Sequence, residues 1–235
     1  QPLAMIFMVL VTFLAFVLAL RQDEAVLAVI GTLGGLSTPF LLHTESGSIP
    51  GLVIYTCVLV TAMMAVYFYR GWRTLMWACT LGGWAVLMAA THAAEDTGQG
   101  MAAVQAGLAF GWLAFGLLPV LREVARDGNR ERWLCPPFGI AERMLAPPGI
   151  RVLAQHVHLA CVSSPLLALM LSMALWDGRI TDRSFGWLTL ATAAVYGGWA
   201  WGLGRLAALE SLARTQRLVA ILLSTIGLCL ILDGE

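Results

Sequence analysis

Eight long apolar stretches run through the chain, and its arginines are concentrated in alternate gaps between them. The chain contains no lysine, and twelve of its 14 basic residues lie in or at the edge of the first, third, fifth and seventh gaps. A helix needs about 20 apolar residues to cross a bilayer, and Lys/Arg in short loops marks the cytoplasmic side. The pattern therefore predicts a multi-pass membrane protein with its arginine-rich gaps in the cytoplasm and both ends of the chain outside.

Helices are the structure that we expect for these stretches. Backbone groups in hydrocarbon must bond within their own segment, and the alternation typical of membrane strands does not occur in the sequence. We expect an all-α membrane protein, a polytopic bundle of about eight transmembrane helices. The predicted spans are Pro2–Leu20, Ala25–Leu42, Pro50–Tyr69, Thr74–Ala94, Met101–Leu121, His156–Trp176, Phe185–Ala207 and Leu218–Leu232.

Composition agrees with a lipid environment. Only 12% of the residues are charged, about half the share of a typical soluble domain, which is roughly 25%. Membrane lipids are therefore expected partners, and nucleic acid is not. We expect residues 1–235 to form a single transmembrane helical domain. Because the chain begins with Gln1 and its last apolar stretch has 15 residues, we expect it to be a fragment that packs against further helices of the same full-length protein.

One gap, Arg122–Gln155, differs from the others in length and composition. It contains six arginines and two Pro-Pro units, at Pro136 and Pro147. The sequence predicts a cytoplasmic Arg/Pro-rich loop over residues 122–155. Such a loop either lies on anionic lipid headgroups, where arginine supplies the attraction, or forms a docking surface for a partner.

The predicted spans carry no ionisable acid or arginine in their interior. Charged groups within a membrane usually mark ion or proton pathways. The pattern argues against a proton-coupled pump, a channel with a charged filter, and carboxylate chemistry within the membrane. We expect a protein that is not an enzyme and that carries no cofactor.

Two Ser-Pro breaks occur at similar places in the second and sixth spans. The first contains Ser37, Thr38 and Pro39, and the second contains Ser163, Ser164 and Pro165. Transporters built from repeated halves place substrate sites at interrupted helices, so these six residues are candidates for a substrate path. Ordinary kinks are the alternative, because hydroxyl groups can bond the carbonyls that proline leaves free.

Glycines in three spans predict close helix packing. Small residues about four apart form a groove that another helix backbone can enter. The candidate packing glycines are Gly31, Gly34, Gly35, Gly107, Gly111, Gly198 and Gly202.

Two histidines are the only candidates for metal ligands, although the sequence does not favour a metal site. His43 and His92 end the second and fourth spans, with Glu45 and Glu95 nearby in the sequence. If these spans packed side by side, the imidazoles and a carboxylate could bind Zn²⁺ or Cu²⁺. The alternative is that each histidine simply meets headgroups and water.

The second and third spans resemble a known family. The stretch Gly31–Leu42, the pair Gly47 and Ser48, Tyr55, and the turn Arg70–Arg73 are similar to predicted bacterial membrane proteins catalogued as domain of unknown function 2339. The resemblance implies a bacterial inner-membrane location and a longer parent chain with more spans. It supplies no catalytic residue.

Two functions remain open from the sequence besides a membrane metalloenzyme or haem protein that would use His43 and His92. The favoured hypothesis is a structural or scaffold component of a larger membrane assembly, because packing glycines are abundant and the predicted spans hold no charge in their interior. The alternative is a transporter or flippase for an uncharged or amphipathic substrate, built around the Ser-Pro breaks.

Overall fold

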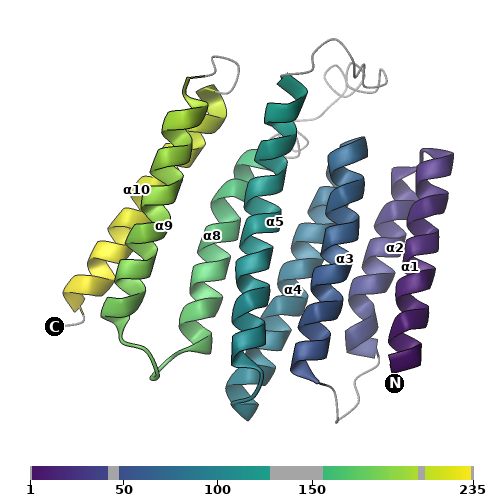
Figure 1. Ribbon diagram of the computed structural model, residues 1–235, viewed down its shortest axis with the longest axis horizontal. Helices are drawn as coiled ribbons and strands as arrows, with labels where there is room; N and C mark the ends of the chain where they lie inside the picture. The colour runs from purple at the N-terminus through teal and green to yellow at the C-terminus, as the bar shows by residue number, and fades with distance from the viewer. Residues whose placement is uncertain (1, 42–47, 128–155, 206–209, 234–235) are drawn as a thin grey trace, which may run out of the picture. The chain divides into compact units, whose positions relative to one another are not determined.

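The computed structural model describes residues 2–41, 48–127, 156–205 and 210–233 (Figure 1). Within these ranges the chain is all helical, which confirms the predicted class, and no strand occurs among them. The helices are α1 (Pro2–Gln22), α2 (Ala25–Leu41), α3 (Ile49–Arg70), α4 (Arg73–Thr97), α5 (Met101–Asp127), α8 (His156–Leu175), α9 (Asp182–Leu203) and α10 (Glu210–Asp233).

Five of these helices are long and apolar enough to cross a membrane: α3, α4, α5, α8 and α10. Shorter apolar helical segments, Leu10–Gln22 and Ala25–Thr38, lie in α1 and α2. Helix α9 belongs to neither group. An apolar multi-helix chain is therefore observed, while eight membrane crossings stay a prediction.

Helix α3 shows how local sequence sets the boundaries of a helix. The Ser48 hydroxyl accepts a hydrogen bond from the Gly51 amide at 3.1 Å, which satisfies one of the free N–H groups of the first turn. At the other end Gly71 adopts a left-handed conformation with φ of 76°, and its N–H donates to the Tyr67 carbonyl at 2.7 Å. Glycine adopts this conformation without steric cost, so the chain can turn at once into α4.

Helix α10 begins eight residues before the predicted span Leu218–Leu232. The hydropathy pattern stops at Arg214 and Arg217, but both are exposed. Leu212, Gln216 and Val219 are buried on another face of the same helix. An amphipathic first section thus continues the apolar helix toward its N-terminus, and arginines on its open side do not end it.

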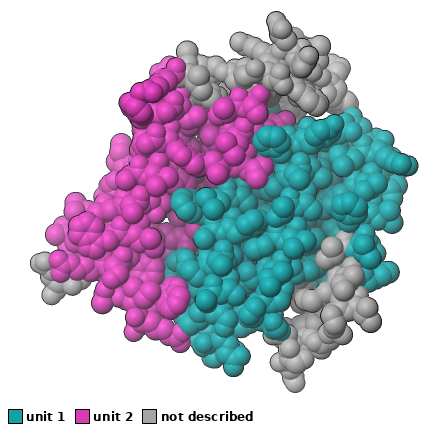
Figure 2. All heavy atoms as spheres, viewed as in Figure 1, with its two compact units in different colours: residues 1–115, 170–175 teal, residues 116–169, 176–235 magenta. Residues whose placement is uncertain are grey.

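The described residues form two compact units (Figure 2). Unit 1 comprises Gln1–Phe115 and Met170–Leu175, and unit 2 comprises Gly116–Leu169 and Trp176–Glu235. Helices α5 and α8 each contribute residues to both units. The prediction of one domain over residues 1–235 stays a prediction.

In unit 1, helix α2 packs against α1 and α4, and α3 packs against α4 (Figure 1). The core holds large side chains that are fully buried, including Leu59, Met63 and Tyr67 of α3. The ring centroids of Trp84 and Phe115 lie 5.8 Å apart, and the ring planes meet at 49°. Aromatic pairs favour such a tilted arrangement. Apolar packing and aromatic contact together hold α3, α4 and the first part of α5.

In unit 2, helices α9 and α10 pack along one another (Figure 1). Their backbones come close together at Gly186 and Gly227, where a Cβ built on Gly186 would lie 2.8 Å from the Gly227 carbonyl oxygen. A separate core of Val120, Val157, Cys161 and Leu212 joins α5, α8 and α10. Unit 2 therefore combines one close backbone crossing with a small apolar core.

Candidate functional site

The Ser-Pro break in α2 is closed by hydrogen bonds within unit 1. Ser37 and Thr38 both donate their hydroxyls to the Gly34 carbonyl, at 3.0 and 2.8 Å. Pro39 has no N–H for the Gly35 carbonyl, its usual helical acceptor. The Tyr55 hydroxyl of α3 donates to that carbonyl at 2.8 Å.

Tyr55 therefore takes the place of the amide that proline lacks. The Tyr55 side chain is 6% exposed, so an unpaired carbonyl here would be costly. Sequence reasoning did not assign Tyr55 a role, because the link joins residues 20 positions apart on two helices. The proline at Pro39 was the available signal, since it predicts a free carbonyl four residues earlier.

The break in α8 differs, because its polar groups are not paired in the same way. Ser164 is fully buried, and its hydroxyl has no hydrogen-bond partner among the described residues. Ser163 is half-buried and Pro165 is buried. The residues Ser37–Pro39 lie in unit 1, and Ser163–Pro165 lie in unit 2.

Gln216 of α10 is a further buried polar residue that sequence reasoning missed. It is fully buried, and neither its amide nitrogen nor its amide oxygen has a hydrogen-bond partner within the described ranges. Leu212, one turn before it on α10, shares a core with Cys161 of α8, whose thiol donates to the Gly116 carbonyl at 3.6 Å. The predicted span began at Leu218, so Gln216 fell in a gap. The apolar residues four before and three after it were the signal that it lies on a helix face.

The candidate packing glycines fall into two groups. A Cβ built on four of them would meet a neighbouring helix at 2.7 to 3.2 Å; these are Gly31, Gly35, Gly107 and Gly111. A Cβ on Gly34, Gly198 or Gly202 would meet nothing within 4 Å in the part of the chain that is described. The helix-spacing pattern alone does not separate these groups, because it does not say which face of a helix is covered.

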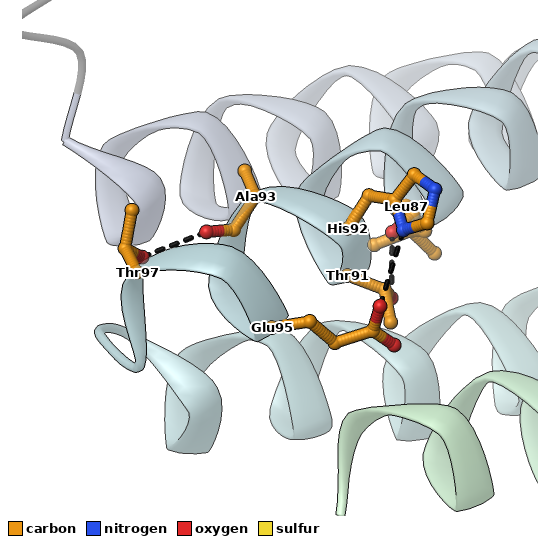
Figure 3. A network of polar contacts seen from close by, with 6 residues as sticks. All are labelled: Leu87, Thr91, His92, Ala93, Glu95 and Thr97. Carbon is orange, nitrogen blue, oxygen red and sulfur yellow. Dashed lines mark hydrogen bonds and ion pairs between the residues drawn. The ribbon is translucent and has the colours of Figure 1, made fainter.

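His92 lies at the exposed end of α4, in the network shown in Figure 3. Its side chain is 85% exposed, and its Nδ1 atom lies 3.1 Å from Glu95 Oε2. His43 lies outside the described residues. Among the residues that are described, no group of three or more His, Cys, Asp or Glu side chains could hold a metal ion.

Charged residues at the ends of α9 and α10 contact an aromatic ring and a carboxylate. The guanidinium of Arg205 lies 3.7 Å from the centroid of the Trp201 ring, a cation–π contact. Arg214 donates to Glu210 at 2.7 Å. This hydrogen bond and the charge of Arg214, with a smaller effect from Arg217, lower the pKa of Glu210 from its ordinary value.

The predicted loop 122–155 is described only at its start. Residues 122–127 form the last turns of α5, where Arg122 pairs with Glu123 at 3.6 Å. The Arg122 side chain is mostly buried. Residues 128–155, with both Pro-Pro units, lie outside the described residues.

Comparison with protein families finds a match that covers the whole chain. No curated protein and no solved structure matches the sequence. A family model described as "Predicted membrane protein (DUF2339)" matches residues 1–235, which confirms the resemblance drawn from Gly31–Leu42 and Arg70–Arg73. The apolar helices of the structure agree with that description. The chain therefore belongs to the DUF2339 family of predicted membrane proteins.

Proposed function

We propose that the protein is a structural or scaffold component of a larger assembly in a bacterial inner membrane. The observation that carries this proposal is the use of polar side chains in unit 1 to join one helix to another. Tyr55 joins α3 to α2, Arg70 joins α3 to α1, and Gln105 of α5 donates to Ser172 of α8 at 3.0 Å. Groups used in this way hold helices in fixed positions.

The exposed side chains support the same proposal. The outward faces of α1, α9 and α10 carry large apolar residues, among them Phe7, Trp187, Trp201 and Leu218, each at least 60% exposed. Apolar surface of this kind suits contact with lipid or with further transmembrane helices. We further propose that the arginine-rich gaps face the cytoplasm.

Extraction of the tagged protein from its native membrane in lipid nanodiscs tests the scaffold role. We expect chemical cross-linking to recover partners in a fixed ratio, and depletion of this protein to lower the amounts of those partners in the membrane. A protein that migrates alone, and that moves or converts a substrate after reconstitution, would contradict the proposal.

A second candidate function is transport of an uncharged or amphipathic substrate. The observation that favours it is the Ser164 hydroxyl, which is buried beside Pro165 without a partner among the described residues. If transport occurs, Ser164→Ala and Pro165→Ala should abolish flux into vesicles while the protein stays folded. Thr38→Ala is the matched control, because Thr38 already donates to its own helix. Unchanged flux in both α8 variants would remove this candidate.

A further inference from the structure

Gln216 occupies a position where a carboxamide is costly unless something binds it. Leu212, Gln216 and Val219 are spaced four and three residues apart, so they share one face of α10, and each is at most 4% exposed. Neither polar atom of the Gln216 amide has a hydrogen-bond partner among the described residues. A buried amide without partners destabilises a fold, whereas a leucine would suit this apolar face.

The facing surface of α8 offers further hydrogen-bonding groups. Cys161 of α8 shares an apolar core with Leu212, which lies one turn before Gln216 on α10. Ser164 lies about one turn beyond Cys161 on the same face of α8. The Ser164 hydroxyl is fully buried and has no partner in the described part of the chain. Pro165 lacks the N–H that would bond the Cys161 carbonyl, so that carbonyl loses its usual helical donor.

These groups determine the chemistry of a ligand that they could bind. A carboxamide and a hydroxyl both donate and accept, while the carbonyl only accepts. None of the three carries a charge, so a buried ionised ligand would have no counter-charge from them. A hydroxyl or a carboxamide on the ligand could bond to them in both senses. The polar end of the ligand is therefore uncharged.

The surroundings of these groups are apolar. Cys161 and Ser164 lie in the candidate span Val157–Leu175, and Gln216 lies in Leu212–Leu232. The outer face of α10 is apolar, with Leu218 and Ile221 each more than 60% exposed. We propose that Gln216 and Ser164 form a binding site for the hydroxyl or carboxamide end of an uncharged amphiphile that enters from the lipid. This binding site goes beyond the structural role and does not require transport.

Photolabelling of the full chain in lipid nanodiscs tests the site. The probes are a diacylglycerol and a primary fatty amide, each with a diazirine in the acyl chain, and a diacylglycerol methyl ether that lacks the hydroxyl donor. We expect the first two probes to label α8 or α10. The methyl ether should label the wild-type protein about tenfold less, as expected for loss of a buried hydrogen bond. The diacylglycerol and the fatty amide should label the Gln216→Leu variant about tenfold less for the same reason.

Gln105→Leu is the matched control, because Gln105 is also a membrane-helix glutamine but donates to Ser172. It should keep the labelling and lower the melting temperature. Gln216→Leu should lose the labelling and melt at or above the wild-type temperature, since it removes an unpartnered amide. Labelling of α8 and α10 that does not depend on the hydroxyl or carboxamide would overturn the proposal, as would a lower melting temperature for Gln216→Leu.

Ser164→Ala gives a second test in which very little volume changes. It removes one hydroxyl from α8 and leaves α10 intact, so loss of labelling cannot be attributed to a misfolded α10. We expect a several-fold loss of labelling by both probes. Wild-type labelling in Ser164→Ala would contradict the site.

Discussion

The guanidinium of Arg70 donates a hydrogen bond to the Leu20 carbonyl at 2.9 Å, across 50 positions of the chain. The same side chain pairs with Asp23 at 3.0 Å, a residue that turns the chain with φ of 57°. Arg70 at the end of α3 thus closes the C-terminal end of α1. Cations favour this position because the last carbonyls of a helix are unpaired and partly negative. The first and third gaps between spans consequently lie at one end of unit 1.

Replacing Arg70 should loosen the contact between α1 and α3. Arg70→Ala removes a charged hydrogen bond and an ion pair, but the Arg70 side chain is 34% exposed, so we expect a loss of about 1 kcal/mol in unfolding free energy. Arg70→Lys should recover only part of it, because an ammonium group cannot reproduce the planar fork. Arg21→Ala, an exposed change at the same end, should have little effect. Equal effects of Arg70→Ala and Arg21→Ala in chemical unfolding would contradict this.

Tyr55→Phe should leave the Gly35 carbonyl without its donor. We expect a loss of about 1–3 kcal/mol, the usual cost of an unpaired buried group. The sharper measurement is a double-mutant cycle with Pro39→Ala, which restores an N–H at residue 39. Tyr55→Phe should then cost clearly less in the Pro39→Ala background. Additive effects of the two changes would show that the hydroxyl does not replace the missing amide.

Two glycines of α9 should respond differently to alanine. At Gly186 the added methyl would lie 2.8 Å from a backbone oxygen of α10, so α9 and α10 must separate, at a cost of about 1–3 kcal/mol. At Gly198 nothing lies within 4 Å among the described residues, and alanine should stabilise the helix by up to about 1 kcal/mol. Thermal unfolding of the two variants measures the difference. Similar melting temperatures would contradict the close backbone crossing.

The Glu210 carboxyl should titrate below its ordinary range, and Arg214→Ala should raise its pKa, because Arg214 supplies the largest part of the shift. A lowered pKa in the folded state means that the stabilisation is present at neutral pH. It is lost as the pH falls through the folded-state value. The chemical shift of the Glu210 carboxyl carbon, followed by NMR as the pH is changed, measures this pKa. A pKa that is unchanged in Arg214→Ala would contradict the helical pairing of residues 210 and 214.

The helices could be predicted from the sequence because each one contains a long continuous run of apolar residues. Such a run can be recognised without knowing which other helices it contacts. The start of α10 was missed because Arg214 and Arg217 interrupt the run, although only one face of the helix carries them. The spacing of Leu212, Gln216 and Val219 indicates that the helix continues through this stretch with one buried face. A hydropathy average over the stretch does not show this, because it mixes the buried and exposed faces.

The polar groups of the candidate site depend on contacts between helices, which the sequence alone does not determine. Thr38 and Ser164 look alike as hydroxyls beside prolines, yet Thr38 donates to Gly34 and Ser164 has no partner among the described residues. The close approach of Gly186 to Gly227 likewise involves one glycine from each of two helices. A spacing rule within one helix cannot find such a pair.

Cysteine accessibility across the membrane is the most direct test of the predicted eight spans and their orientation. The starting variant lacks the five native cysteines, and a single cysteine then replaces Gln22, Ser46, Trp72, Gln99 or Thr181. Each variant is treated with an impermeant maleimide in spheroplasts and in inside-out vesicles. We expect Gln22→Cys and Trp72→Cys to react only from the cytoplasmic side, and the other three only from outside. Reaction of cysteines in two consecutive gaps from the same side of the membrane would contradict the predicted topology.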